Sequence, residues 1–235
     1  MNFSDPETNV KELSLKEGAR VADFGAGSGA YVFALASAVG QSGRVFAIDV
    51  QQELLARISK DAERERIRNI EFVWADLETD GGSRLEAGSM DAVIISNILF
   101  QAEKKEVLIG EAGRVLRSGG ELIIVVPRAD GWLARLAGPH WFALDAPRHL
   151  YHFTPVTLGE LLAKVGFRVR EIRSFQPPEH LSFSWIYWAK RSRSMEGNPL
   201  VTSRVGQVGS RLLAGMVELL GAGDSMVVRA SRSGP

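Results

Sequence analysis

Short apolar runs rich in β-branched residues alternate along most of the chain with longer amphipathic segments. This alternation is typical of a parallel sheet with helices on both faces, because each parallel strand needs a crossover helix to bring the chain back. We therefore expect a doubly wound α/β fold with a mostly parallel sheet of seven strands. The expected strands are Arg20–Phe24, Val45–Ile48, Ile70–Trp74, Ala92–Ser96, Leu122–Val126, Val169–Ser174 and Ser225–Arg229.

Helices are expected between these strands, and their ends carry recognisable signals. Asp5 can cap a first helix with Pro6 at its first position, and "RSGG" at 117–120 is typical of a helix end. The other expected helices are Ala30–Val39, Gln52–Glu65, Lys104–Leu116 and Pro155–Val165.

Two segments break the alternation, 128–154 and 176–223. Both follow late strands, at the carboxyl edge where an open α/β sheet binds its ligands, so we expect lid insertions after strands five and six. The chain is expected to form a single domain, 1–235, in which 1–127 binds a cofactor and 128–235 forms the substrate side.

The composition argues against several classes of function. Basic and acidic residues balance at 28 each, so the charge excess typical of a nucleic-acid partner is missing. The absence of cysteine excludes disulfides and thiolate sites, and the four scattered histidines make a metal centre an unfavoured interpretation. The N-terminal stretch lacks the pattern of a signal peptide and no stretch is long and apolar enough to span a bilayer, so we expect a cytoplasmic protein.

The stretch "VADFGAGSG" at 21–29 indicates the class of ligand. Gly25, Gly27 and Gly29 allow a sharp turn between a strand and a helix and a close approach of a ligand to the backbone. The dinucleotide fingerprint has the spacing G-x-G-x-x-G, whereas this chain has G-x-G-x-G with Asp23 two residues before it. A carboxylate at that place disfavours a diphosphate and favours a cationic ligand.

Acidic residues also follow the next two strands. Asp49 ends the strand in "VFAIDV", where a carboxylate can accept both hydroxyl groups of an adenosine ribose. Asp76 follows the third strand and is a candidate acceptor for the adenine amino group, with Leu77 along the ring. Each of these residues could also be an ordinary feature of a strand end or a tight turn.

Together these motifs resemble the class I S-adenosylmethionine-dependent methyltransferases, a Rossmann-like fold, over about residues 10–126. The resemblance implies S-adenosyl-L-methionine as cofactor and S-adenosyl-L-homocysteine as product. It places the glycine loop beside the methionine part, Asp23 near its amino group, Asp49 on the ribose, and Asn97 toward the methyl-transfer centre. The cofactor-binding residues it implies are Asp23, Gly25, Ala26, Gly27, Gly29, Asp49, Val50, Asp76, Leu77 and Asn97.

Within that family the first half is similar to ubiquinone and menaquinone C-methyltransferases. The stretch "HLYHFTPVTLGELLAKVGF" is similar to a bacterial branch related to ubiquinone-pathway O-methyltransferases. His149 and His152 are candidate proton acceptors and Tyr151 a candidate substrate contact, although either histidine could simply hold its loop in place. Arsenite methylation, which relies on cysteine thiolates, is excluded, and "SNIL" replaces the tetrapeptide of adenine-methylating DNA enzymes.

The stretch 180–220 places aromatic residues ahead of basic ones and then a helical apolar pattern. Trp185 and Trp188 are candidates for lining the acceptor pocket. The segment could touch a membrane surface or admit a greasy substrate, but a helical pair packed on the sheet or on a second subunit is the favoured interpretation.

The expected function is methyl transfer to a small-molecule or lipid-like acceptor, on oxygen rather than carbon or nitrogen, by a monomer or homodimer. Alternatives are a nicotinamide-dependent oxidoreductase and a non-catalytic cofactor-binding module. The chain lacks the Y-x-x-x-K pair of such oxidoreductases at these tyrosines: the residue four positions after Tyr151 is Pro155, and the residue four positions after Tyr187 is Arg191.

Overall fold

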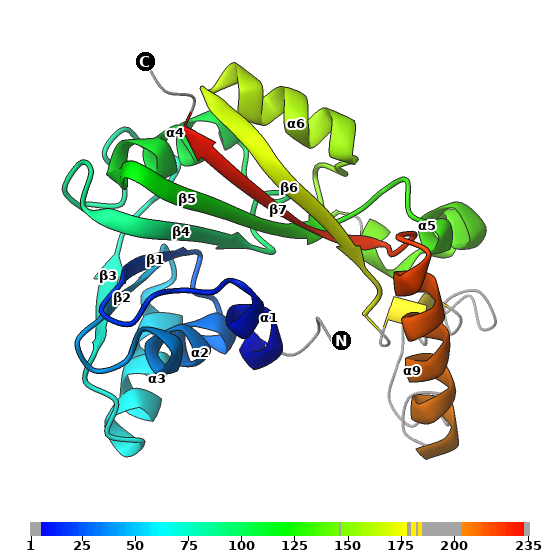
Figure 1. Ribbon diagram of the computed structural model, residues 1–235, viewed down its shortest axis with the longest axis horizontal. Coiled ribbons are helices and arrows are strands. Elements are labelled where there is room, and N and C mark those ends of the chain that lie inside the picture. The colour runs from blue at the N-terminus through cyan, green and yellow to red at the C-terminus, as the bar shows by residue number, and fades with distance from the viewer. Residues whose placement is uncertain (1–5, 146, 178–179, 182, 185–203, 233–235) are drawn as a thin grey trace.

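A computed structural model describes residues 6–145, 147–177, 180–181, 183–184 and 204–232. A seven-stranded sheet with the order β3-β2-β1-β4-β5-β7-β6 forms its centre, and β7 runs antiparallel to both of its neighbours (Figure 1). The expected doubly wound, mostly parallel fold is therefore confirmed. The strands are β1 (Arg20–Phe24), β2 (Arg44–Asp49), β3 (Ile70–Trp74), β4 (Met90–Ser96), β5 (Leu116–Pro127), β6 (Phe167–Phe175) and β7 (Ser225–Arg232).

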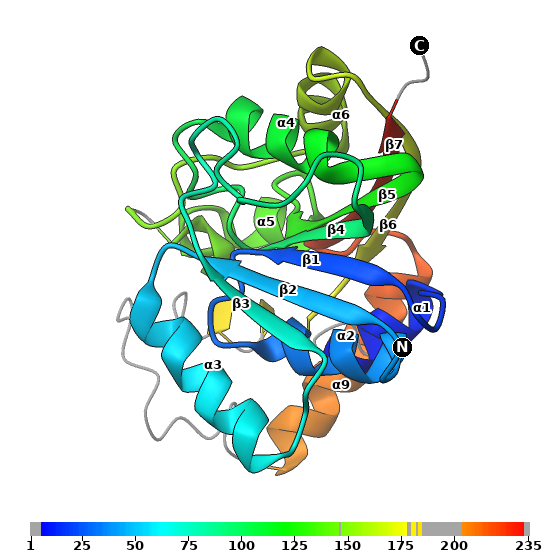
Figure 2. The same cartoon turned by 90° about the vertical axis from the view of Figure 1, so that its left-hand side faces the viewer.

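Helices cover both faces of the sheet (Figure 2). One face carries α1 (Pro6–Glu12), α2 (Ala30–Val39) and α3 (Gln52–Arg64). The other face carries α4 (Lys105–Val115) and α6 (Pro155–Lys164). Because each face has its own helical layer, two apolar cores form, one on each side of the sheet.

Strand β1 shows how the sequence supplies both cores. Val21 packs in the core beneath α1, α2 and α3, while Ala22 and Phe24 pack in the core beneath α4 and α6. All three side chains are fully buried. A strand covered on both faces needs apolar residues at successive positions, which is why the central strands appear in the sequence as uninterrupted apolar runs.

The chain changes direction across the sheet between β1 and β4. It passes outward from β1 through β2 to β3 on one side, and then from β4 to β5 on the other. The loops that follow β1, β2, β3 and β4 therefore leave the same carboxyl edge on both sides of this reversal. Open α/β sheets form their ligand crevice at such a point.

The boundary between α4 and β5 differs from the expectation. The helix was predicted to reach Leu116 and to end with 117–120 as a turn, but α4 ends at Val115 and β5 starts at Leu116. Leu116 pairs with Met90 of β4, and the register shifts between Met90 and Ala92. Tertiary pairing with β4 thus extends the strand backward over residues whose local signals favour a helix end.

The two segments expected as insertions contain helices of their own. The first includes α5 (Trp132–Ala137) and two 3-10 turns, Gly138–His140 and Phe142–Leu144, and the second includes α9 (Arg204–Leu219). They share a small apolar cluster separate from the two main cores. Its buried members are Leu133, Ala134, Trp141, Ala143, Leu181 and Ala214.

Candidate cofactor and active site

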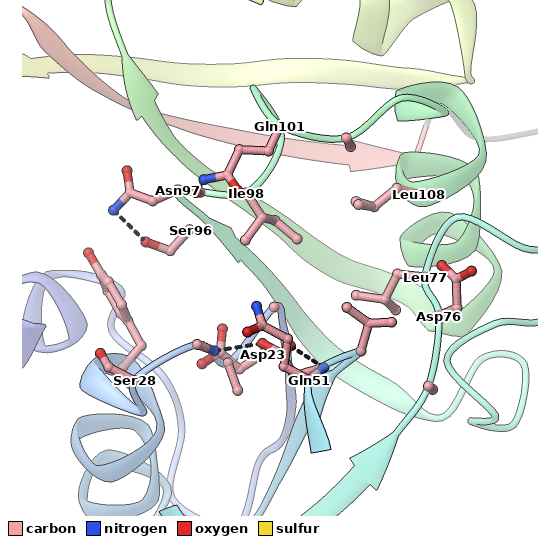
Figure 3. Close-up of a pocket in the computed structure, with 18 of the residues that line it drawn as sticks. Asp23, Ser28, Gln51, Asp76, Leu77, Ser96, Asn97, Ile98, Gln101 and Leu108 are labelled. Atoms are coloured by element: carbon pink, nitrogen blue, oxygen red, sulfur yellow. Dashed lines mark hydrogen bonds between the residues drawn. The ribbon is translucent and has the colours of Figure 1, made fainter. Parts of the chain in front are cut away.

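A cleft of about 530 Å³ opens at the carboxyl edge of the sheet, beyond the ends of the neighbouring strands β1 and β4 (Figure 3). Its walls come from the four loops that follow β1, β2, β3 and β4. All but one of the residues predicted to bind the cofactor line it: Asp23, Gly25, Ala26, Gly27, Asp49, Val50, Asp76, Leu77 and Asn97. Residues predicted from four separate sequence motifs thus come together in one cleft.

The three glycines of the loop after β1 have different structural roles. All three have positive φ, at 82°, 52° and 82° for Gly25, Gly27 and Gly29. A Cβ atom on Gly25 would lie 2.5 Å from Ile98 Cγ2, and one on Gly29 would lie 2.9 Å from Ile58 Cγ1. Gly29 therefore lets α2 pack on α3 and does not line the cleft, whereas Gly27 faces open space and leaves backbone accessible to a ligand.

Asp49 joins the end of β2 to the glycine loop. Its Oδ2 accepts a hydrogen bond from the Gly27 N–H at 2.8 Å, and its Oδ1 accepts one from the Gln51 N–H at 2.8 Å. The residue is only 6% exposed. A carboxylate oxygen has a second lone pair, so the side chain can hold the loop and still accept two hydroxyl groups of a ligand.

Asp23, at the carboxyl end of β1, is a buried carboxyl group beside a second acid. It is 1% exposed, and its Oδ1 has no hydrogen-bond partner among the described residues. Burial, and then the charge of Asp49, raise the pKa of Asp23 to about 7. An unpartnered buried oxygen in a negative environment suits a cationic group, and it disfavours a diphosphate.

Asp76 and Leu77 form the wall beyond β3. Asp76 is exposed, and its Oδ1 accepts a hydrogen bond from the Glu78 N–H at 2.9 Å. Leu77 is buried and joins the core under α4. Val50, which is 61% exposed, also lines the cleft. An apolar wall next to a carboxylate that has further acceptor capacity fits a flat heterocycle with an amino group.

Asn97 follows β4 in a strained conformation. Its φ of +57° lies in the left-handed region, which residues other than glycine seldom adopt, although asparagine does so more readily than most. Its N–H donates to Val125 O at 3.0 Å, and its Nδ2 lies 3.4 Å from Ser96 Oγ. Strain of this kind is found where a fold directs a side chain into a site, and Figure 3 shows Asn97 at the cleft.

Several cleft residues were not among the sequence candidates. They come from the glycine loop and the start of α2, from the loop after β2, from the "SNILFQA" stretch that begins at the end of β4, and from α4; they are Ser28, Tyr31, Gln51, Ser96, Ile98, Gln101 and Leu108. The Tyr31 hydroxyl accepts a hydrogen bond from Asn9 Nδ2 at 2.7 Å, which brings α1 to the edge of the site. Most of these residues are close in the sequence to predicted site residues, and that proximity was the only sequence signal for them.

His149 and His152 lie outside the lining of the cleft and bond to their own segment. His149 Nδ1 is 2.7 Å from Ala143 O, and its ring centroid is 3.8 Å from that of Phe100. Burial is the main cause that lowers the pKa of His149 below its usual value. His152 Nε2 is 3.2 Å from Leu144 O.

Tyr151 anchors this segment to the loop after β4. Its N–H and that of Leu150 both donate to Phe100 O, at 3.1 and 2.9 Å. The Lys105 ammonium lies 3.0 Å from the centroid of the Tyr151 ring, a cation–π contact. Phe100 follows Asn97 by three positions, so the segment reaches the neighbourhood of the cleft from outside. Trp185 and Trp188 lie outside the described residues.

A family model described as a methyltransferase domain matches residues 15–148. An arsenite methyltransferase of Aquipseudomonas alcaligenes is 34% identical over 125 residues, which are 52% of this chain and 36% of that protein. A ubiquinone/menaquinone C-methyltransferase of Rhizobium johnstonii is 29% identical over 109 residues, 46% of this chain and 41% of that protein. The matched region thus spans less than half the length of these relatives.

Solved structures show the same fold. A SAM-dependent methyltransferase from Aquifex aeolicus has a TM-score of 0.60 at 24% identity, over 72% of this chain and 83% of that one. The [4+2]-cyclase SpnF has a TM-score of 0.66 at 18% identity, over 97% of this chain and 80% of that one. A fold shared with a cyclase does not fix the reaction, so chemistry must be argued from the cleft.

Proposed function

The chain belongs to the methyltransferase-domain family, and on that premise we propose that it binds S-adenosylmethionine in the cleft and transfers its methyl group to a small-molecule or lipid-like acceptor. The observation that carries the proposal is the buried pair of acids beside the glycine loop. The unpartnered Asp23 oxygen suits the amino group of the methionine part, and Asp49 keeps lone pairs for the ribose. Asp76 and Leu77 would take the adenine.

The same pair of acids weighs against the alternative of a nicotinamide-dependent oxidoreductase. A dinucleotide places its pyrophosphate on the helix that follows the glycine loop. Here Asp23 and Asp49 line the cleft beside the glycine loop. Asp23 is 1% exposed and Asp49 is 6% exposed. Two carboxyl groups in a partly desolvated site would repel a diphosphate. A module that binds the cofactor without turnover remains the second alternative, and it differs only in lacking a product.

When bound, the cofactor supplies a methyl group already activated on a positively charged sulfur. The task of the protein is then alignment and exclusion of water, which can contribute several kcal/mol to lowering the barrier, roughly 7–11 in well-oriented systems. Asn97, fixed by its bond to Val125 O, would hold the reacting end of the site. The loops from β1 and β2 fix the other end through the Asp49 bond to Gly27.

His149 is the stronger of the two proposed proton acceptors. Its lowered pKa favours the neutral ring near pH 7. Because Nδ1 faces the carbonyl oxygen of Ala143, it is the nitrogen that carries the proton, which leaves the lone pair on Nε2. A hydroxyl of the acceptor could lose its proton to that atom. His152 Nε2 likewise faces a carbonyl oxygen, that of Leu144, so in a neutral ring the lone pair of His152 is on Nδ1.

The proposal includes the kind of atom that is methylated. We favour methylation of oxygen, for which the resemblance of the second half to an O-methyltransferase branch is the support, with Tyr151, Trp185 and Trp188 as candidate acceptor contacts. The named relatives include C-methyltransferases and arsenite methyltransferases. The chain has no cysteine, so it lacks the thiolates on which arsenite chemistry would rely. A cytoplasmic monomer or homodimer without a nucleic-acid partner completes the proposal.

Calorimetry with S-adenosylhomocysteine tests the assignment of the cleft. Asp49→Ala removes the acceptor for a ribose hydroxyl pair and the bond that holds Gly27. Hydrogen bonds to a charged group contribute about 1.5–3 kcal/mol, so the affinity should fall roughly 10- to 100-fold.

Asp91→Ala is the matched control. Asp91 also accepts a backbone hydrogen bond, from the Arg20 N–H at 2.7 Å, but it does not line the cleft. Its replacement should leave the affinity unchanged. An Asp49→Ala protein that is folded and binds as tightly as the wild type would remove Asp49 from the site. Labelled S-adenosylmethionine with metabolite extracts, followed by mass identification of the labelled product, would identify the acceptor, and cofactor binding without any product would support the non-catalytic alternative.

A further inference from the structure

The cleft contains a hydroxyl group to which the proposed function gives no role. Tyr31, on the first turn of α2, lines the cleft. Asn9 Nδ2 of α1 donates a hydrogen bond to the Tyr31 hydroxyl oxygen at 2.7 Å, and the Ser96 side chain at the end of β4 bonds to the same hydroxyl. Asn9 and Ser96 are both buried. The Tyr31 hydroxyl is thus held by two elements that are far apart in the sequence.

The proton of this hydroxyl is available to a ligand. Burial is the main cause that raises the pKa of Tyr31, and it outweighs the lowering by the hydrogen bonds from Asn9 and Ser96, so the side chain is a neutral phenol at pH 7. A phenol oxygen has two lone pairs and one proton. The Asn9 amide and the Ser96 hydroxyl can both donate to the oxygen, which leaves the Tyr31 proton for an acceptor in the cleft.

The charges of the cleft leave one part of the cofactor without a partner. Apart from Tyr31, the ionisable side chains among the described residues that line the cleft are all acids: Asp23, Asp49, Asp76 and Glu78. The methionine part of S-adenosylmethionine carries a carboxylate as well as an ammonium group. Acids repel that carboxylate, so it needs neutral hydrogen-bond donors.

Tyr31 lies where such a donor is needed. The ammonium and carboxylate groups of the cofactor are bonded to the same carbon atom, so the side chains that bind them must be close neighbours. Asp23, the proposed partner of the ammonium group, is near enough to Tyr31 for its charge to raise the Tyr31 pKa. Asp23 pairs with Ile94 of β4 across the sheet, and Ser96 follows Ile94 by two positions. The sheet therefore brings Asp23 and the partner of Tyr31 to the same edge.

Resting on the proposed function, we propose that the Tyr31 hydroxyl donates a hydrogen bond to the carboxylate of the methionine part, and that Asn9 positions this hydroxyl. Asn9 does not line the cleft, so it acts through Tyr31. Helix α1 packs on α2 (Figure 1), and through Asn9 it becomes part of the cofactor site. The competing role for Tyr31 is contact with the methyl acceptor.

Calorimetry with two ligands tests the proposal. One is S-adenosylhomocysteine, and the other is its decarboxylated analogue, which keeps the amino group. Tyr31→Phe removes only the hydroxyl, so affinity for S-adenosylhomocysteine should fall roughly 10- to 100-fold, the loss of a hydrogen bond to a charged group, while affinity for the analogue is unchanged. Asn9→Ala should show the same selectivity with a smaller loss. Combined with Tyr31→Phe, it should add little, because both act through one hydroxyl.

Ser37→Ala is the control. Ser37 is an exposed hydroxyl residue of the same helix and does not line the cleft, so this variant should bind both ligands like the wild type. Equal loss of both ligands in Tyr31→Phe would give the hydroxyl a structural role, and unchanged affinity with lowered turnover would place it at the acceptor. Either result would overturn this proposal alone. A wild type that binds neither ligand would overturn the proposed function as well.

Discussion

Asp23 is a residue at which stability and binding oppose each other. Its pKa is raised from 3.8 to about 7, so between these values the folded protein holds a proton that the unfolded chain has released. Stability therefore falls as pH rises through this window, and the cost of ionising the buried group is fully present above about pH 7. Asp23→Asn should stabilise the protein at pH 8 by roughly 2–4 kcal/mol and have little effect near pH 4.

Denaturant unfolding of both proteins at the two pH values measures this difference. Asp91→Asn serves as a control, since Asp91 is a partly exposed carboxylate paired with Arg117. Asp23→Asn should also weaken binding of S-adenosylhomocysteine at pH 8, since a neutral amide offers an ammonium group a hydrogen-bond acceptor but no opposite charge. A stability gain for Asp23→Asn that is equal at pH 4 and pH 8 would show that the acid is ionised in the folded protein throughout.

For individual residues, the sequence showed which side chains come together in the cleft, but not which hydrogen bonds they form. The spacing of the glycines and acids predicted that Asp23, Asp49 and Asp76 would meet at one edge, because the carboxyl ends of parallel strands do so. The bond from Gly27 to Asp49 and the burial of Asp23 depend on packing between strands. Gly29 resembled a ligand contact in the sequence, yet its tight neighbour is Ile58 of α3.

Among the structural elements, the strands could be predicted well because each is a short run rich in apolar residues, both in the buried central strand β1 and in the partly exposed edge strand β3. Arg20–Phe24 and Ile70–Trp74 were predicted with the observed bounds. The start of β5 was not, since pairing of Leu116 with Met90 overrides the local signals for a helix end. The helical apolar pattern within 180–220 predicted a helix where α9 lies. The short helix α5 and the 3-10 turns after β5 were not predicted, because they pack in the small cluster with residues far away in the sequence, such as Leu181.

The segment between α5 and α6 gives a prediction for His149. Its folded-state pKa lies below the usual value, so the neutral ring stabilises the protein above pH 6.5, and this contribution is lost as pH falls further. His149→Ala removes the bond to Ala143 O and the contact with Phe100. The melting temperature of the wild type should exceed that of the variant at pH 7.5, by a margin that shrinks at pH 5.5.

Turnover separates the two roles of the same residue. If His149 accepts a proton from the acceptor, turnover of His149→Ala should fall about 100-fold or more while affinity for S-adenosylhomocysteine is retained. His140→Ala is the control, because His140 is a half-exposed histidine of the same segment. Turnover that falls only in proportion to the folded fraction would assign His149 a purely structural role.

In the whole molecule, Asp224 connects segments that the sequence keeps far apart. It lies just before β7 and is fully buried. Its carboxylate accepts hydrogen bonds from Trp141 Nε1 at 2.7 Å and from Gln176 Nε2 at 2.9 Å, and His180 Nδ1 lies 3.2 Å from both oxygens. Its main-chain oxygen accepts the Arg128 N–H at 2.7 Å. One residue thus ties the regions after β5 and β6 to the sheet.

Removing this carboxylate should loosen one half of the molecule and leave the other intact. Asp224→Ala leaves the Trp141, Gln176 and His180 donors without their acceptor, at a cost of about 3–5 kcal/mol. Hydrogen exchange should accelerate in 128–154 and in α9, which share the small cluster with Trp141, and stay slow in β1, β2 and β4. Affinity for S-adenosylhomocysteine should persist, because the lining of the cleft comes from the other half. Asp224→Asn, which keeps one acceptor oxygen, should have a smaller effect. Equal acceleration throughout the sheet would mean instead that the two halves unfold as one cooperative unit.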